Sequence, residues 1–289
     1  MYEYSKSIKS SDSDELINTH LLRPLAGLIV RMLYNTRATP NQVTVASILA
    51  GLIAAALYLK GTHFAVATAG LAVTVKDILD SADGQLARLT QQYSRAGRFL
   101  DSIGDFVVNA AIFGSVGYTL TAINGGLQYG IIALLGLAGI TFRVSYHVFY
   151  QTSFLHFEQK YQTNRITEEI REEDERGDRL ALRLQRVFQA IYGWQDRLVL
   201  RIDGWCSGGL QSEEVRREWY MDRTGILLSG FLGMGTELFV LTVCSLFNRL
   251  ELYLFLNVVL MNAVLVLNLL YRRVRLRRRL MFGGDANGR

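Results

Sequence analysis

Long apolar runs, each close to the length of a bilayer-crossing helix, dominate this chain. Such a helix needs about 20 apolar residues. The first run begins after Thr39-Pro40-Asn41, where Thr39 is a suitable N-cap and Pro40 suits the first helical turn, and it continues to about residue 59. We expect five further membrane-spanning helices, at about residues 64–79, 99–123, 127–149, 224–247 and 252–271.

The residues before the first run follow a different pattern. Residues 14–36 mix apolar side chains with Arg23 and Arg31. This mixture is typical of an amphipathic helix that lies in the membrane interface. We therefore predict an all-α integral membrane protein with six transmembrane helices, preceded by an N-terminal interfacial amphipathic helix.

Residues 153–222 interrupt the apolar pattern between the fourth and fifth runs. They begin with charges of both signs at helical spacing and continue with mixed aromatic, apolar and basic residues. We interpret them as a cytoplasmic helical insertion along the interface, serving either as a charged linker without further function or as a partner-binding element. Because tryptophan favours the headgroup level, we place three tryptophans there: Trp194, Trp205 and Trp219.

These patterns divide the chain into five parts. Residues 1–38 form the N-terminal cytoplasmic segment with the interfacial helix, and residues 39–152 form transmembrane helices 1–4 with the candidate catalytic motif. Residues 153–222 are the insertion, 223–272 form transmembrane helices 5–6, and 273–289 are a basic cytoplasmic tail.

Composition and charge add an orientation to this picture. Half of the 289 residues are apolar, and the net charge is +5. The basic excess gathers in arginines after the last apolar run, a position that favours contact with anionic lipid rather than with nucleic acid. Arginines also precede the first run and separate the second from the third, whereas the other connections carry little charge. The positive-inside rule therefore places both termini and the segment between the second and third runs in the cytoplasm.

Four carboxylates stand where the second and third runs meet this cytoplasmic segment. If the second helix continues, Asp80 and Asp83 lie on one of its faces, and Asp101 and Asp105 lie on one face of the third helix. Charged side chains at a membrane edge are costly and therefore indicate a functional site. Two antiparallel helices would turn these carboxylate pairs toward each other, which suits one or two divalent cations with oxygen ligands.

The neighbouring residues suggest what such cations would serve. Arg88 carries a guanidinium group that fits phosphate, and Gly84 and Ala87 leave room for a pyrophosphate or a base. The set predicts metal-assisted phosphoryl transfer in which one carboxylate takes a proton from an attacking hydroxyl. We assign that role to Asp105, because it lies one turn deeper in its helix, nearer to a membrane-held acceptor. Lys76, one turn before the first acid, could neutralise a neighbouring acid or meet a phosphate.

The spacing D-x2-D-G-x2-A-R-x8-G-x3-D-x3-D resembles the signature of the CDP-alcohol phosphotransferases, and every fixed position is matched. TPNQVT at residues 39–44 is similar to the family's lead-in to its first helix, and residues 20–44 are also similar to archaeal-type inositol phosphodiester synthases. The resemblance does not extend to residues 153–222. It implies a homodimer in the membrane that uses Mg²⁺ or Mn²⁺, two ions in all, to transfer a phospho-alcohol group from a CDP-alcohol to a hydroxyl acceptor and release CMP.

The resemblance also implies roles for individual residues. It makes Asp80, Asp83 and Asp101 metal ligands, and gives Asp105 both the role of base and a metal contact. The positions that it implies for CDP binding are Gly84, Ala87, Arg88, Gly97, Asn41 and Thr44.

The signature leaves the two substrates open. We expect transfer of a phosphatidyl group in phospholipid or related phosphodiester synthesis, and the alternative is a CDP-linked polar alcohol of the choline, ethanolamine or inositol type. Residues 142–154 contain Arg143 but lack the second basic residue that members with phosphorylated acceptors carry. Arg143 and His147 share a helical face and are candidate acceptor residues; the alternatives are a buried Arg143–Glu237 pair and a packed histidine.

Two other classes of protein are compatible with part of the pattern. A cation transporter with intramembrane carboxylates would explain the acids but not the small residues and the arginine at their spacings. An inert scaffold acting through residues 153–222 would not require the complete set of acids.

Overall fold

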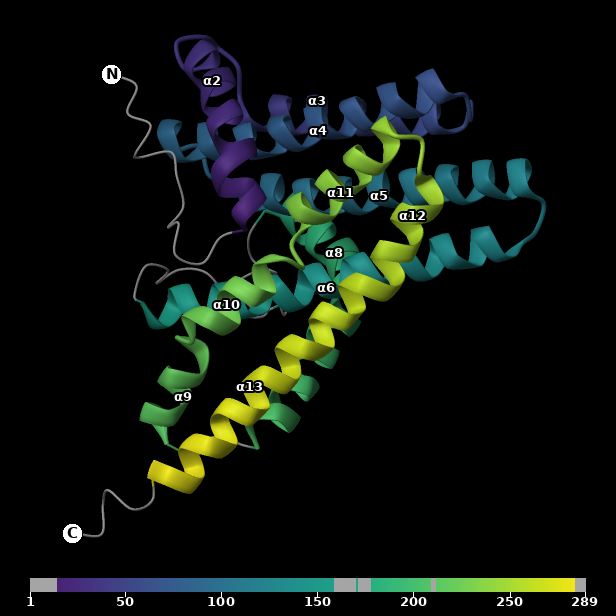
Figure 1. The fold of residues 1–289 in the computed structure, drawn as a ribbon. Coiled ribbons are helices and arrows are strands. Elements are labelled where there is room, and N and C mark those ends of the chain that lie inside the picture. Colours follow the sequence, from purple (N-terminus) through teal and green to yellow (C-terminus); the bar gives the residue numbers. More distant parts are fainter. Residues whose placement is uncertain (1–14, 159–169, 171–177, 209–211, 284–289) are drawn as a thin grey trace.

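The computed structural model describes residues 15–158, 170, 178–208 and 212–283, with side chains up to residue 278, and these contain helices and no strands. Four long helices follow one another up and down: α3 (Pro40–Tyr58), α4 (His63–Thr90), α5 (Arg95–Asn124) and α6 (Gln128–Phe157) (Figure 1). The others are η2 (Asn18–Leu22), α2 (Arg23–Leu33), α8 (Arg179–Ser207), α9 (Glu213–Tyr220), α10 (Arg223–Gly230), α11 (Met234–Leu246), α12 (Leu250–Phe255), η3 (Leu256–Leu260) and α13 (Met261–Gly283).

Local signals set the ends of the helices that carry the acidic motif. Thr39 caps α3 through a capping box, in which Gln42 N donates to Thr39 Oγ1 and Thr39 N donates to Gln42 Oε1 at 2.9 Å. Pro40 occupies the first turn, so the predicted start of this helix is confirmed. α4 runs without a break through Asp80 and Asp83 and ends at Thr90, before Gln91, which is left-handed at φ 56°. Ser94 then caps α5 by accepting a hydrogen bond from Gly97 N at 2.9 Å.

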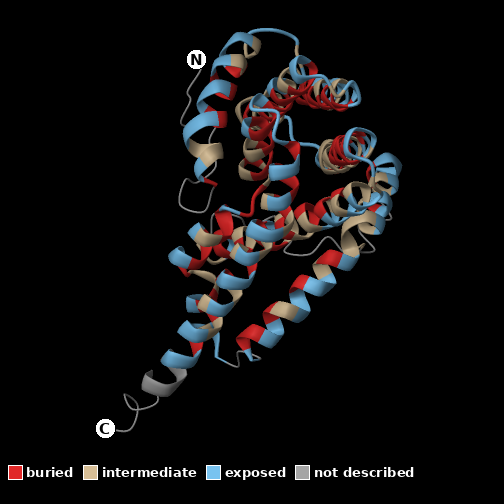
Figure 2. Cartoon of the chain, turned by 45° about the vertical axis from the view of Figure 1, so that its right-hand side comes forward, coloured by how far each residue is buried: buried red, intermediate tan, exposed pale blue. Residues whose placement is uncertain are grey.

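Buried residues lie on the inner faces of the helices (Figure 2), and their apolar side chains form three clusters. The largest joins α3, α4, α5, α6, α11 and α12, and a second joins α6 to α8, α9, α10 and α13. Glycines allow α3 to approach α5 closely, because a Cβ at Gly104 would collide with Ile48 and one at Gly51 would collide with Val108. This approach fixes the helix that carries Asp105 against the start of the bundle.

Five segments in the described part of the chain are long and apolar enough to cross a membrane. They are Pro40–Tyr58, Arg95–Asn124, Gln128–Phe157, Glu213–Leu246 and Leu250–Arg278. α4, the second predicted span, is not among them, because charged side chains follow its apolar first half. These segments indicate an integral membrane protein, and its described residues are all-helical.

The predicted insertion contains a helix that packs into the bundle. Residues of α8 spaced three and four apart, among them Gln185, Gln195 and Val199, are almost fully buried against α5 and α6. Trp219, which we expect at the headgroup level, is 5% exposed, and its indole N donates to Asp203 at 2.8 Å. The indole therefore has its hydrogen-bond partner inside the protein, and its depth in the membrane stays a prediction.

Candidate active site

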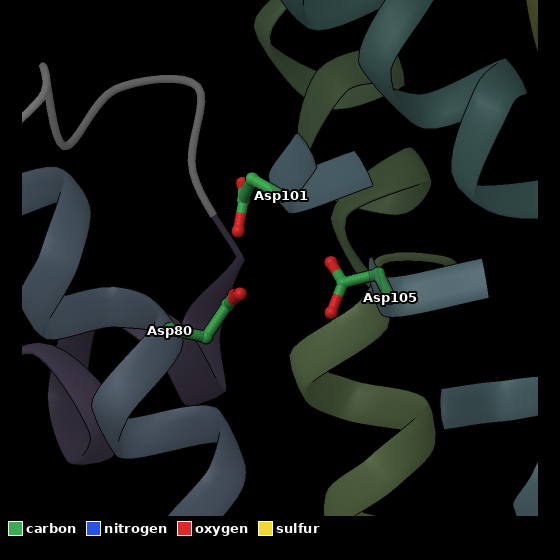
Figure 3. Close-up of side chains that lie close together, drawn as sticks. All are labelled: Asp80, Asp101 and Asp105. Atoms are coloured by element: carbon green, nitrogen blue, oxygen red, sulfur yellow. The ribbon is translucent and has the colours of Figure 1, made fainter. Parts of the chain in front are cut away.

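Three carboxylates of the predicted constellation converge between α4 and α5. Asp80 projects from α4 toward Asp101 and Asp105, which project from successive turns of α5 (Figure 3). Each offers an oxygen, and these three oxygens all lie within 4.8 Å of one another. The facing arrangement expected from helical spacing is thus present for these three acids.

This spacing of oxygens fits a divalent cation. Two ligand oxygens on opposite sides of one ion, each about 2.1–2.5 Å away, are about 4–5 Å apart. Asp80, Asp101 and Asp105 therefore supply a set of hard oxygen donors that Mg²⁺ or Mn²⁺ can bind without a large rearrangement.

Lys76 brings a positive charge into the same cluster. Its ammonium group forms an ion pair with Asp105 and lies 3.4 Å from Asp77 Oδ1 and 3.9 Å from Asp80 Oδ1. The side chain is 1% exposed, so this charge is held in place rather than solvated. Of the two roles that the sequence allows for Lys76, the structure shows the neutralisation of acids.

Asp83 lies apart from the group of three. Its carboxylate accepts a hydrogen bond from the Thr44 hydroxyl of α3. Burial, followed by the negative charge of Asp80, raises the pKa of Asp83 to about 8. Thr44, which we predicted to contact CDP, is buried, and its hydroxyl is hydrogen-bonded to Asp83. Asp83 remains a predicted metal ligand.

The predicted nucleotide-binding residues lie beside the acids. The Arg88 guanidinium group lies over Gly84, with Nη1 3.4 Å from the position of a Cβ at that glycine. Gly97 faces Asn41, because its Cβ would be 2.6 Å from Asn41 Oδ1. Ala87 is half-buried on the same part of α4. Helical spacing places Gly84 one turn after Asp80 on α4 and Gly97 one turn before Asp101 on α5, with Arg88 a further turn along α4.

The two acceptor candidates are buried in the described structure. Arg143 Nε donates to Glu237 Oε1 at 2.7 Å, and neither side chain is exposed. His147 is 2% exposed, and its Nδ1 is 3.1 Å from Ser229 Oγ. These contacts agree with the buried-pair and packed-histidine alternatives.

Sequence spacing did not identify two features of this site. Asp77 is a fifth acid, buried beside Lys76, and the adjacent Lys-Asp dipeptide was the available signal. Tyr192 of α8 donates a hydrogen bond to the carbonyl of Ser102, at 3.0 Å. No local pattern relates residues that are 90 positions apart.

Comparisons with known proteins place the same motif in a family. Residues 37–165 match the CDP-alcohol phosphatidyltransferase family. Over 126 residues the chain is 34% identical to a bifunctional IPC transferase and DIPP synthase of Thermococcus kodakarensis, covering 44% of this chain and 27% of that protein. It is 36% identical over 109 residues to an archaetidylinositol phosphate synthase of Pyrococcus horikoshii, covering 37% of this chain and 52% of that protein.

A third relative is the phosphatidylinositol phosphate synthase of Streptomyces avermitilis, 36% identical over 110 residues, with 37% of this chain and 41% of that protein covered. The matches thus span about a quarter to a half of the length of these relatives. The family match includes α4 and α5 with their acids and ends before α8. It covers residues 153–165, so the expectation that the resemblance stops before residue 153 was wrong. The chain therefore carries, over residues 37–165, a domain of the CDP-alcohol phosphatidyltransferase family.

Proposed function

We propose that this protein transfers a phospho-alcohol group from a CDP-alcohol to an acceptor hydroxyl at the acids between α4 and α5, and releases CMP. The observation that carries the proposal is the convergence of Asp80, Asp101 and Asp105 between α4 and α5, the two helices on which the arginine and the small residues of the motif also lie. Acids with only a structural role would not be expected to converge from two helices, because their negative charges repel one another.

Asp80, Asp101 and Asp105 would hold Mg²⁺ or Mn²⁺, and Asp83 would join them by turning from Thr44. Two bound ions would neutralise the pyrophosphate and stabilise the departing CMP. Arg88 would bind a phosphate oxygen by a charge-assisted hydrogen bond. Small residues at 84, 87 and 97 leave space for CDP next to these groups, with Asn41 at the edge.

The protein's own groups account for the proton and the leaving group. Asp105 takes the proton of the acceptor hydroxyl as its oxygen attacks the phosphorus that carries the alcohol. The bond between that phosphorus and the oxygen of CMP breaks, and CMP departs with the electron pair. Lys76 keeps Asp105 oriented toward the cluster through their ion pair.

The test is CMP release by the purified full-length protein. We would incubate it with several CDP-alcohols, with Mg²⁺, Mn²⁺ or a chelator, and with and without acceptors. Asp105→Asn should abolish turnover while retaining CDP binding. The matched control is Asp178→Asn, which alters an exposed N-cap of α8 that asparagine also suits. Full turnover by Asp105→Asn would refute its role as base, and cation uptake without any CMP release would favour the transporter alternative.

The acceptor class is a separate question that the same assay resolves. The relatives' names concern inositol phosphate lipids and related compounds. We propose a polyol or its phosphate as the acceptor, although Arg143, the basic residue nearest to the expected acceptor position, is already paired with Glu237. Comparing inositol, inositol phosphate, glycerol phosphate and diacylglycerol as acceptors distinguishes this from transfer of a polar alcohol to a lipid.

We further propose that α4 is a sixth span, that α2 lies in the interface, and that the five parts of the chain have the boundaries given above. Residues 21, 25, 28 and 32 of η2 and α2 form an exposed apolar stripe, opposite a face buried on α4, which supports an interfacial position. Both termini and the acids would then face the cytoplasm, in a homodimer.

Labelling of single cysteines tests this topology. In a background without Cys206 and Cys244, Gln92→Cys, after α4, should react with an impermeant reagent from the side of the membrane opposite to Lys60→Cys, before α4. Labelling of both from one side would contradict the six-span arrangement. Cross-linking in membranes tests the dimer, which would be rejected if only monomers were recovered.

A further inference from the structure

α8 lies against the turns of α5 that carry the acids, although it is outside the family match. The rings of Phe188 and Phe99 have centroids 5.4 Å apart, and those of Tyr192 and Phe106 are 6.2 Å apart. Phe188 and Tyr192 also contact each other, at 4.9 Å. The aromatic face of α8 thus covers the side of α5 next to the one that presents Asp101 and Asp105.

Two hydrogen bonds hold α8 in this position. Arg95 Nη2 donates to Gln185 Oε1 at 2.8 Å, and Gln185 is fully buried. The Tyr192 hydroxyl donates to the main-chain carbonyl of Ser102 at 3.0 Å. Because Ser102 lies between the two acids of α5, this second bond acts on the turn that presents them.

The Tyr192 hydroxyl is suited to this role. Burial raises its pKa, and the negative charges of Asp105 and Asp101 raise it further. The hydroxyl therefore stays protonated and remains a donor at physiological pH.

We propose that Tyr192 is a positioning residue for the acidic site. Through the Ser102 carbonyl it holds the first turns of α5 at the rotation that aims Asp101 and Asp105 at Asp80. A segment outside the matched domain then contributes to the active site, and α8 is more than a linker. The inference rests on the proposed function, since it assumes that these acids bind a divalent cation.

The test compares Mn²⁺ binding by the full-length wild type and Tyr192→Phe, followed by electron paramagnetic resonance in detergent solution. Removing an outer partner of a metal site commonly costs 10–100-fold in affinity, so we expect a loss of about tenfold for Tyr192→Phe. In turnover assays kcat should fall by a similar factor, while KM for the CDP-alcohol changes less than about twofold, because Tyr192 does not touch the nucleotide-binding residues.

Tyr220→Phe is the matched control. It removes the same hydroxyl oxygen from a partly buried tyrosine. That hydroxyl donates to Asp203 of α8 at 2.8 Å, and Asp203 is not one of the converging acids of α4 and α5. Its Mn²⁺ affinity should equal that of the wild type. Equal losses in both variants, or wild-type affinity in Tyr192→Phe, would overturn the inference. Because Mn²⁺ binding needs no turnover, a protein that binds Mn²⁺ but releases no CMP would refute the proposed reaction separately.

Discussion

The buried pair of Arg143 and Glu237 offers a quantitative test of whether Arg143 is structural or serves the acceptor. The two side chains are 0% exposed and are joined at 2.7 Å. Removing one partner of a buried pair typically costs about 3–5 kcal/mol, because the other charge stays buried without compensation. Arg143→Met should lower the free energy of unfolding by about this amount, leaving Glu237 with Asn257 as its remaining hydrogen-bond partner.

Replacing both residues gives a different expectation. Arg143→Met combined with Glu237→Leu removes both charges, so the large penalty disappears. The remaining cost is the loss of two hydrogen bonds. One runs from Arg143 Nη1 to Asn262 Oδ1, at 2.9 Å, and the other from Asn257 Nδ2 to Glu237 Oε2, at 2.8 Å. At about 1 kcal/mol each, the double variant should be about 2 kcal/mol less stable than the wild type.

Thermal unfolding in detergent measures these differences. At about 2–4 °C per kcal/mol, the melting temperature should fall by roughly 6–20 °C in Arg143→Met and by roughly 4–8 °C in the double variant. KM for the acceptor is measured in parallel and should be unchanged in the double variant. A double variant that is as unstable as the single one, or one that is stable but has lost its affinity for the acceptor, would refute the structural role of Arg143.

Three further predictions concern α3, α4 and α5. Thr44→Val removes the hydrogen bond to buried Asp83 and should cost about 1–3 kcal/mol in thermal unfolding, whereas Thr44→Ser should retain stability; equal losses would contradict this. Gly104→Ala should cost about 1–3 kcal/mol, because its Cβ meets Ile48; an undiminished loss in the Ile48→Ala background would show another cause. Because the folded pKa of Asp83 is about 8, above its unfolded value of 3.8, the folded state binds the extra proton. Stability of the metal-free protein should therefore fall as pH rises from about 4 to 8; Asp83→Asn should make this fall smaller, and an unchanged slope would refute the prediction.

The sequence predicted the elements of the acidic site well, because their signals are local. Thr39 and Pro40 mark the start of α3 by capping chemistry, and the spacing of Asp101 and Asp105 places them on one face of any helix. The structure brings these two acids to Asp80, as their positions on antiparallel helices require. The sequence did not predict the hydrogen-bond partners of Thr44, His147 and Trp219, because those partners are distant in sequence.

By itself, the sequence determined that the chain forms long apolar helices and that two of them carry a set of acids, an arginine and small residues at fixed spacings. These properties depend on residues within one or two turns of each other, where helical geometry fixes the relative positions. Only the tertiary structure decided that Lys76 pairs with Asp105, that Arg143 pairs with Glu237, and that α8 packs on α5. The reason is physical: a buried charge or hydroxyl takes the partner that packing brings within reach, and packing joins residues from the whole chain.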